Sequence, residues 1–338
     1  MSASACQHPE SPLVTIAIPV LNEASLLPGL LTALRMQTWP REAMQVIFVD
    51  GGSEDDTLPL IRSLAETFPQ VLILDNPKRV AAAGLNVALQ HARGIYFLRL
   101  DARSRPAPDY IERCVDYLQT EEWMGVSGPQ IACSREKKGE AIALALNHPI
   151  GAGNPSYRRT RIPTTSDTLY LGAYPTSLLR ELQGWREQFA ANEDYELNHR
   201  IRKRGGRLLV APDIHIRYIA RDRLRELFSQ YARYGAWRVE TLRLHPRAIR
   251  FRHLAPAVWS AALGLSLLAL PISPWPIWLI LLPYLFAITL ASMHVTLFQH
   301  PRLFFRVWLA FPVMHLGWGI GFWRRLLTRK LPCAIMSR

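Results

Sequence analysis

The C-terminal quarter of the chain holds three long apolar segments, and these limit its possible folds more than any other feature. They cover Leu254–Ile272, Trp275–Ala291 and Leu303–Trp323. Each is close to the ~17–25 residues that a helix needs to cross a bilayer. The first two contain no charged side chain, and only Ser273 and Pro274 separate them. We therefore predict a membrane-embedded helical hairpin within a transmembrane region of two or three helices at 254–323.

The third segment is less hydrophobic than the first two. It contains Arg306, Pro312, His315 and three glycines, which make a helix easier to bend. If all three segments cross the bilayer, the basic tail at 324–338 lies outside the cytoplasm, against the tendency of positive residues to lie on the cytoplasmic side. The sequence therefore leaves open whether this segment spans the bilayer, re-enters it or lies at its surface.

Positive charge is concentrated beside the apolar segments. The 338 residues carry 40 Lys and Arg against 27 Asp and Glu, a net charge of +13. Basic residues crowd the stretch 217–252 and the tail, which favours the lipid bilayer as a partner and argues against nucleic acid. We predict an amphipathic interfacial region at 221–253, with Leu224–Arg238 as a helix on the membrane surface. An ordinary surface helix is the alternative.

Upstream of this region, residues 13–220 alternate short apolar runs with longer amphipathic stretches. This pattern is typical of an α/β fold with a mostly parallel sheet that is buried on both faces. Polar residues follow the strands, at the edge where open α/β sheets bind ligands. The predicted strands are Val14–Pro19, Gln45–Val49, Val71–Leu74 and Ile95–Leu100, and the predicted helices are Ser25–Arg35, Asp56–Thr67, Val80–His91 and Pro108–Tyr117.

The N-terminal tail and the cysteines point to the cytoplasm. The tail at 1–12 has neither the basic start nor the apolar core of a secretory signal. Cys6, Cys114, Cys133 and Cys333 show no spacing typical of a metal site or a disulfide framework. We therefore expect residues 13–220 to remain in this reducing compartment.

Two polar strings follow the first two predicted strands. The first is Pro19-Val-Leu-Asn22-Glu23, and the second begins at Asp50-Gly51 and continues as Gly-Ser-Glu-Asp-Asp-Thr. Glycines let a backbone approach a flat base or a ribose closely, and an aspartate accepts hydrogen bonds from either. A capped turn before a helix is the alternative explanation of the second string.

Two further strings complete a family pattern. They are Asn-Pro-Lys-Arg-Val-Ala-Ala-Ala-Gly-Leu-Asn at 76–86 and Leu-Arg-Leu-Asp-Ala at 98–102. In this order and spacing, the four strings resemble family 2 glycosyltransferases. The match runs from about Val14 to His215, and the arrangement with C-terminal membrane helices resembles the succinoglycan glucosyltransferase branch of that family.

The resemblance implies a GT-A fold, a nucleotide-sugar donor, Mg²⁺ or Mn²⁺ as cofactor and inversion at the anomeric carbon. By position, one group of residues would line the nucleotide and the base, and another would lie near the rest of the donor. The first group is Pro19, Asn22, Glu23, Asp50 and Gly51. The second is Arg79, Asn86, Asp101 and Arg103.

The sequence departs from the family pattern at the cation site. Asp101 matches the first acid of the family's Asp-x-Asp motif, but Arg103 stands at the third position. Donor phosphates and water can supply most of the oxygen ligands of Mg²⁺ or Mn²⁺, so one missing carboxylate leaves a site possible. Arg103 would then contact a phosphate directly. The alternative is a non-catalytic relative with a weakened cation site.

Acidic residues at Glu193 and Asp194 resemble the acceptor-side motif of the family. Asp194 is the predicted catalytic base, because inverting transfer needs a carboxylate to take the proton of the acceptor hydroxyl. Acids that merely complement a helix dipole are the alternative. His215 stands where several family members place a histidine that reaches the cation; a structural histidine is equally consistent with the sequence.

Two other strings resemble acceptor-side elements. Gly172 and Ala173 lie in a small-residue string like the family's acceptor loop, although a strand and turn explain them equally well. Gln230 and Arg233 belong to a string like the Gln-x-x-Arg-Trp motif of processive members, with Tyr234 in place of tryptophan. A basic and aromatic interface helix is the alternative.

The sequence thus predicts transfer of a hexose, from a UDP-linked donor, to a lipid-linked saccharide at the cytoplasmic membrane face, in polysaccharide biosynthesis. Transfer to polyprenyl phosphate is one alternative, in which the acceptor is already an anion and needs no base. A membrane-tethered protein that binds nucleotide sugars without turnover is another.

Overall fold

The computed structural model describes residues 13–66, 68–153, 158, 160–248 and 250–328. Its centre is a sheet with the strand order β3-β2-β1-β4-β9-β6-β10-β8. The first four strands in this order run parallel, which confirms the α/β fold expected from the sequence. These strands are β1 (Val14–Val20), β2 (Met44–Asp50), β3 (Val71–Asp75) and β4 (Tyr96–Arg99).

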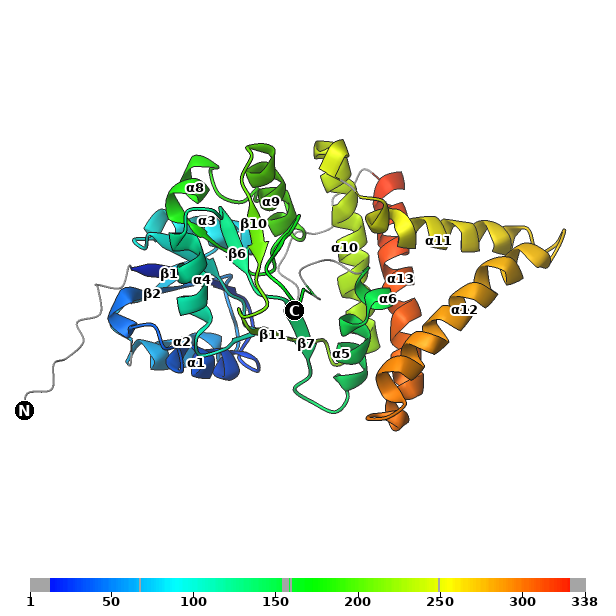
Figure 1. The fold of residues 1–338 in the computed structure, drawn as a ribbon, viewed down its shortest axis with the longest axis horizontal. Coiled ribbons are helices and arrows are strands. Elements are labelled where there is room, and N and C mark those ends of the chain that lie inside the picture. The colour runs from blue at the N-terminus through cyan, green and yellow to red at the C-terminus, as the bar shows by residue number, and fades with distance from the viewer. Residues whose placement is uncertain (1–12, 67, 154–157, 159, 249, 329–338) are drawn as a thin grey trace, which may run out of the picture.

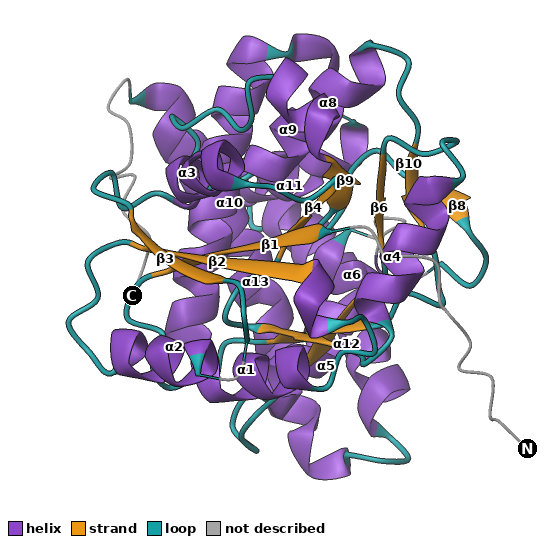
Figure 2. Cartoon of the chain, turned by 90° about the vertical axis from the view of Figure 1, so that its left-hand side faces the viewer, coloured by secondary structure: helices purple, strands orange, loops and turns teal. Residues whose placement is uncertain are grey.

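Helices cover both faces of this sheet, as Figure 2 shows. One apolar core contains side chains of α1 (Leu27–Arg35), α2 (Thr57–Ala65) and α4 (Tyr110–Gln119). The other contains side chains of α3 (Ala81–His91), α8 (Thr176–Glu181) and α9 (Glu193–Lys203). The strands of β1 and β2 are buried along their whole length, which explains why their sequences are apolar runs without alternation.

The second half of the domain is less regular. β9 (Ala173–Pro175) runs antiparallel to both of its neighbours, β4 and β6 (Gly125–Ser127). β10 (Leu208–Val210) and β8 (Thr164–Thr165) complete the large sheet. A second sheet with the order β5-β11-β7 lies beside it. Its strands are β5 (Ser104–Pro106), β11 (Ile216–Ile219) and β7 (Gln130–Cys133).

The C-terminal helices form a separate layer beside the α/β domain (Figure 1). α10 (Leu224–Leu244) and α13 (Phe304–Leu327) stand side by side, and α11 (Phe251–Leu268) and α12 (Trp275–Thr296) form a hairpin that projects away from the domain. The short helices η1 (Arg41–Ala43), η2 (Pro246–Ala248) and η3 (Pro301–Leu303) connect larger elements. Two helices of the domain, α5 (Glu140–Asn147) and α6 (Pro149–Ala152), face this layer.

Glycines allow α10 and α13 to pack in close contact. A Cβ on Gly235 of α10 would lie 2.0 Å from the Trp318 carbonyl oxygen, and one on Gly321 of α13 would lie 1.9 Å from the Ala232 carbonyl oxygen. Near the helix ends, Arg325 forms a 2.5 Å ion pair with Glu240. The apolar face of α10 is therefore covered by α13. The predicted membrane-surface helix thus packs along one face on the third apolar segment, and its contact with lipid stays a prediction.

The predicted hairpin is present, but the helix lengths differ from expectation. α12 and the segment Pro301–Leu327 are the two described helices long and apolar enough to cross a membrane, whereas the apolar part of α11, His253–Leu268, is shorter. At the tip of the hairpin, Ile272 is 90% exposed and Trp275 is 72% exposed. Exposed apolar surface of this extent is typical of contact with lipid.

A single methyl group at Gly235 is expected to destabilise the protein. Gly235→Ala places a Cβ against backbone that cannot move away cheaply, so we expect a loss of about 1–3 kcal/mol of folding free energy. Gly264→Ala in α11 is the matched control, because no atom lies within 4 Å of its added Cβ. Thermal unfolding in detergent should show a lower midpoint only for the first variant. Equal midpoints would contradict the close packing of α10 on α13.

Candidate active site

The loops that follow β1 and β2 are tied together at the carboxyl edge of the sheet. The Asn22 amide donates to Ser53 Oγ at 2.9 Å, and the Asn22 side-chain oxygen accepts from the Glu54 amide at 2.8 Å. The Glu23 amide donates to Thr57 Oγ1 at 2.9 Å. The two polar strings that stand far apart in the sequence thus form one surface.

Asp50 shapes its own turn. Its carboxylate accepts hydrogen bonds from the Gly52 amide and from both the amide and the hydroxyl of Ser53. Gly52 has a φ of 81°, which favours glycine at this position. The capped-turn explanation of this string is therefore realised in the structure, and a contact of Asp50 with a nucleotide base stays a prediction.

Asp101 lies just beyond the end of β4. Its Oδ1 accepts a hydrogen bond of 3.0 Å from the Arg103 amide. The Arg103 guanidinium points elsewhere, since it donates to the carbonyl oxygens of Ile219 and Ala220 at 3.3 and 3.5 Å. Burial raises the pKa of Asp101, and Arg99 and Arg103 partly offset this effect. Arg103 therefore orders the turn around Asp101 without forming a direct side-chain ion pair with it.

Asp194 sits at the start of α9, beside a buried arginine of β4. Its Oδ1 accepts from Arg99 Nη1 at 2.6 Å and from Trp185 Nε1 at 3.0 Å. Arg99 also pairs with Glu193 at 2.8 Å. Burial raises the pKa of Asp194 although Arg99 acts against this shift. Since both bonds go to Oδ1, the carboxylate is held in one orientation and Oδ2 stays available, as a general base requires.

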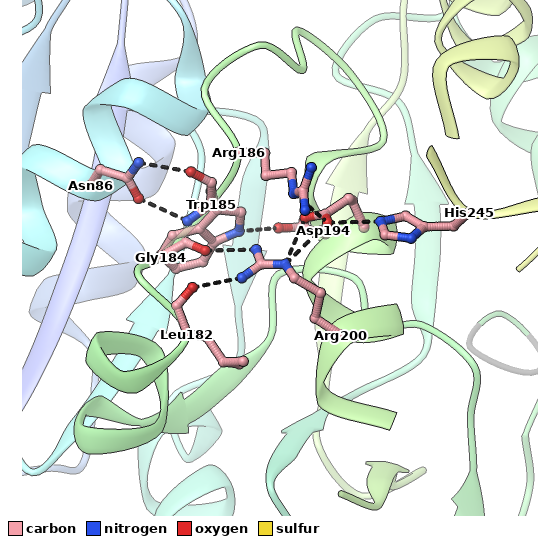
Figure 3. Close-up of polar contacts among 9 residues, drawn as sticks. Asn86, Leu182, Gly184, Trp185, Arg186, Asp194, Arg200 and His245 are labelled. Atoms are coloured by element: carbon pink, nitrogen blue, oxygen red, sulfur yellow. Dashed lines mark hydrogen bonds and ion pairs between the residues drawn. The ribbon is translucent and has the colours of Figure 1, made fainter. Parts of the chain in front are cut away.

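A second set of contacts supports this arrangement (Figure 3). Asn86 accepts from the Trp185 amide and donates to the Trp185 carbonyl oxygen, both at 2.8 Å. A Cβ on Gly184, whose φ is 65°, would lie 2.2 Å from the Asn86 side-chain oxygen. Asn86, predicted near the donor, thus holds the tryptophan that orients Asp194.

The first turn of α9 is anchored by a buried carboxylate as well. Glu196 has no exposed side-chain surface and pairs with Arg186 at 2.9 Å, with Arg200 at 3.0 Å and with His245 at 3.1 Å. Arg200 also donates to the Leu182 carbonyl oxygen. These contacts fix α9 between the turn before it and the end of α10.

One cavity of about 770 Å³ joins these groups. It starts at the carboxyl edge of the sheet and passes Asp194. It then continues to the base of the hairpin, where α11, α12 and α13 form its wall. The predicted residues that line it are Pro19, Glu23, Asp101, Arg103, Glu193, Asp194, Gln230 and Arg233.

The structure does not bring His215 to the cation site. β11 pairs with β5 so that Ile216 lies opposite Pro106 and Tyr218 lies opposite Ser104. The part of β11 next to Arg103 is therefore Ile219, whose amide donates to the Arg103 carbonyl oxygen. His215 is exposed at the far end of the strand. The structure therefore gives no support to His215 as a metal ligand.

Two other predicted acceptor residues are part of the sheet. Ala173 is fully buried in β9, opposite Leu98 of β4. The Gly172 carbonyl oxygen accepts from the Arg99 amide at 3.2 Å. The strand-and-turn explanation therefore holds for both. Arg79 lies in a turn with a φ of 54° and does not line the cavity.

Sequence reasoning missed three residues that the structure brings to the site. Arg99 and Arg221 line the cavity, and Trp185 is fully enclosed behind Asp194. Arg99 had a visible signal, because a charged residue inside a buried strand needs a partner. Arg221 and Trp185 had none, since their roles depend on how distant segments meet.

Glu23 gives a pH-dependent prediction. Burial raises the pKa of Glu23 to about 7, and the positive charge of Arg103 is the largest effect that opposes this shift. The folded state thus holds this proton more tightly than the unfolded chain, whose pKa is 4.5. The stability that Glu23 contributes is present below pH 4.5 and is lost as the pH rises through about 7.

Glu23→Gln should remove the loss of folding stability that accompanies ionisation of Glu23. In detergent with EDTA and no donor, we expect the variant to gain up to about 3 kcal/mol relative to wild type between about pH 5 and pH 8. Glu54→Gln, a change at an exposed neighbour, serves as control and should show no such trend. A difference for Glu23→Gln that does not vary with pH would refute the burial of this carboxyl group.

Solved structures with the same architecture define the fold. The mannosyltransferase PcManGT from Pyrobaculum calidifontis, in complex with GDP-Man and Mn²⁺, superposes with a TM-score of 0.61 at 21% identity, over 91% of this chain and 87% of its own. S. aureus TarS 1-349 gives a TM-score of 0.55 at 16% identity, over 94% and 93%. The fold is therefore the GT-A fold, followed by C-terminal apolar helices.

Sequence comparison assigns the family. The model of "Glycosyl transferase family 2" matches residues 15–175. The succinoglycan biosynthesis protein ExoA of Rhizobium meliloti (strain 1021) is 31% identical over 334 residues, which are 92% of this chain and 94% of that protein. A dolichyl-phosphate-linked glycan glucuronosyltransferase of Methanococcus voltae is 26% identical over 66% of this chain and 72% of its own. The chain belongs to glycosyltransferase family 2 and is a glycosyltransferase.

Proposed function

We propose that this enzyme transfers a hexose, with inversion, from a UDP-linked donor to a lipid-linked saccharide at the cytoplasmic membrane face. The observation that carries the proposal is the single cavity, which connects the carboxyl edge of the sheet to the wall of the apolar helices. A soluble acceptor would not need a cavity that extends to these helices. The relative ExoA, by its name, acts in succinoglycan biosynthesis, and we propose a polysaccharide pathway for this chain too.

The donor end of the cavity contains Glu23, Asp101, Arg103 and Arg221. We propose that Asp101 holds a divalent cation, Mg²⁺ or Mn²⁺, together with the donor diphosphate. The described residues offer no cluster of three His, Cys, Asp or Glu side chains that could hold a metal, so phosphate oxygens and water would complete the ligand set. Such a cation stabilises the charge that develops on the leaving diphosphate. Because the protein would contribute a single carboxylate ligand, we propose that the cation site forms only when the donor is bound.

Asp194 would act on the acceptor. Its fixed Oδ1 and available Oδ2 suit a base that accepts the proton of the attacking hydroxyl. Arg99 and Trp185 hold it in place, and Glu193 shares the positive charge of Arg99. The acceptor hydroxyl would then attack the anomeric carbon from the face opposite the leaving diphosphate, which gives inversion.

We propose that α12, with the hairpin tip, anchors the enzyme in the inner membrane with the α/β domain in the cytoplasm. Two observations support this placement. The tip is apolar and exposed, with Leu268 at 78%. His300, just after α12, pairs with Glu140 of the domain at 2.9 Å, so the hairpin returns to the domain side.

The test is transfer of label from nucleotide sugars into lipid. Detergent-purified enzyme is supplied with a membrane lipid extract and radiolabelled UDP-glucose, UDP-galactose or GDP-mannose. The proposal predicts label in the organic phase from one UDP-sugar, released as saccharide by mild acid. Label that reaches only water-soluble product would contradict the lipid-linked acceptor. Label attached directly to polyprenyl phosphate would favour the alternative in which the acceptor is already anionic.

A further inference from the structure

The cavity has two chemically different ends. Towards the sheet it is lined by carboxylates and arginines, as described above. Towards the layer of C-terminal helices, here called the membrane end, its wall contains apolar and aromatic side chains from three helices. These are Trp259 of α11, Tyr284, Ala287 and Ile288 of α12, and Met314 and Trp318 of α13.

Two polar side chains at the membrane end, Tyr284 and His315, form hydrogen bonds within the protein. Tyr284 Oη lies 2.8 Å from His315 Nδ1, and His315 Nε2 lies 2.8 Å from the Ile150 carbonyl oxygen. Because a carbonyl oxygen only accepts, Nε2 carries the proton and Nδ1 accepts from the tyrosine. The Trp259 ring stacks on the Tyr284 ring with centroids 4.2 Å apart. The Trp259 Nε1 atom is buried without a hydrogen-bond partner, so this end keeps one unpaired N–H donor among apolar and mutually bonded side chains.

The middle of the cavity has the opposite character. Gln230 donates to the Tyr218 and Tyr234 hydroxyls, while its buried side-chain oxygen has no hydrogen-bond partner. Arg233 is a partly buried cation; burial and the nearby Arg221 lower its pKa, and the Tyr234 side chain opposes this shift. No carboxylate of the described residues forms an ion pair with Arg233. The middle thus suits a ligand that carries negative charge and hydroxyl donors.

We propose that the membrane end of this cavity binds the hydrocarbon chain of the acceptor, with Arg233 at the height of the phosphate that joins chain and saccharide. The inference rests on the proposed function and adds a binding site for the chain. Charge complementarity and continuity support one occupant, because the same cavity contains an apolar end, the Arg233 cation and the Asp194 carboxylate, which such a molecule would contact together. Burial of the chain would contribute affinity in proportion to the area removed from water.

Filling the membrane end provides the test. Ala287→Phe adds a ring inside the cavity, and Leu290→Phe places a phenyl ring on an exposed part of the same helix. We expect Ala287→Phe to raise the KM for an acceptor with a long polyprenyl chain by roughly tenfold or more. The KM for the same saccharide diphosphate on a geranyl chain should be unchanged, and Leu290→Phe should match wild type with both. Wild-type behaviour of Ala287→Phe with both acceptors would overturn the proposal.

A binding experiment separates this inference from the proposed reaction. A polyprenyl diphosphate with a photoreactive group at the chain end is cross-linked to the purified enzyme, and the labelled peptides are identified. We expect label on the segments around Ala287 and Met314, reduced by Ala287→Phe but not by Leu290→Phe. Label confined to the outer, exposed face of the hairpin would overturn the chain site. Specific label without turnover of any donor would instead mean that the site exists and the proposed reaction is wrong.

Discussion

Asp194→Asn is expected to lower kcat by about a thousandfold, while the KM for the donor changes by less than about twofold. Asparagine has nearly the same shape and keeps an oxygen for Arg99 and Trp185, but it cannot take a proton. The structure supports an effect on kcat without an effect on donor KM, because the hydrogen bonds from Arg99 and Trp185 both reach Oδ1. The measurement is steady-state release of nucleoside diphosphate in the presence of acceptor.

Glu193→Gln is the matched control for Asp194→Asn. Glu193 contacts the same arginine, at 2.8 Å, so its replacement removes a similar charge next to Arg99. If loss of charge were the cause, both variants would lose activity to the same degree. Full activity of Asp194→Asn would show that the acceptor brings its own negative charge, as a polyprenyl phosphate does.

Asp101→Asn is expected to reduce turnover by about a hundredfold or more, and to abolish Mn²⁺-dependent binding of the nucleotide. An amide is a weak ligand and carries no charge to balance the cation. Isothermal titration of nucleoside diphosphate with and without Mn²⁺ measures the second effect directly. Asp75→Asn at the end of β3, an exposed position outside the cavity, should leave both quantities unchanged. Mn²⁺-dependent binding that survives in Asp101→Asn would place the cation elsewhere.

Much of the α/β domain could be predicted because its signals are local. The strands β1 to β4 are apolar runs buried on both faces, and all four lie within one or two residues of the predicted positions at their starts and ends. The polar strings after these strands also meet, since the carboxyl ends of parallel strands share one edge. The positions of the strands in the sequence were therefore enough to predict that Glu23, Asp101 and the loop of Asp50 lie at one edge of the sheet.

The expectations that the structure does not support concern contacts between distant segments. His215 was judged by its place in the chain, but the register of β11 on β5 carries it away from Asp101 and brings Ile219 next to Arg103. The amphipathic pattern of α10 was equally consistent with a lipid surface and with a partner helix. Only the close fit at Gly235 and Gly321 shows that the partner is α13. Helix partners of this kind are set by small residues on both helices, and a single sequence does not show which pairs meet.

Arg103 illustrates why a motif position needs its three-dimensional context. In the sequence it replaces a carboxylate and suggests a damaged cation site. In the structure its amide supports the Asp101 carboxylate, and its side chain bonds to the end of β11. We therefore interpret the substitution as compatible with catalysis.

Metal-dependent transfer from a UDP-sugar is tested by measuring release of nucleoside diphosphate by the detergent-purified wild-type enzyme, supplied with lipid extract, with and without EDTA. We expect release from one UDP-sugar that depends on the lipid extract, stops with EDTA and returns when Mg²⁺ or Mn²⁺ is added in excess. Tight binding of nucleotide with no release from any donor would contradict this expectation, and would identify a protein that kept the glycosyltransferase fold without the reaction.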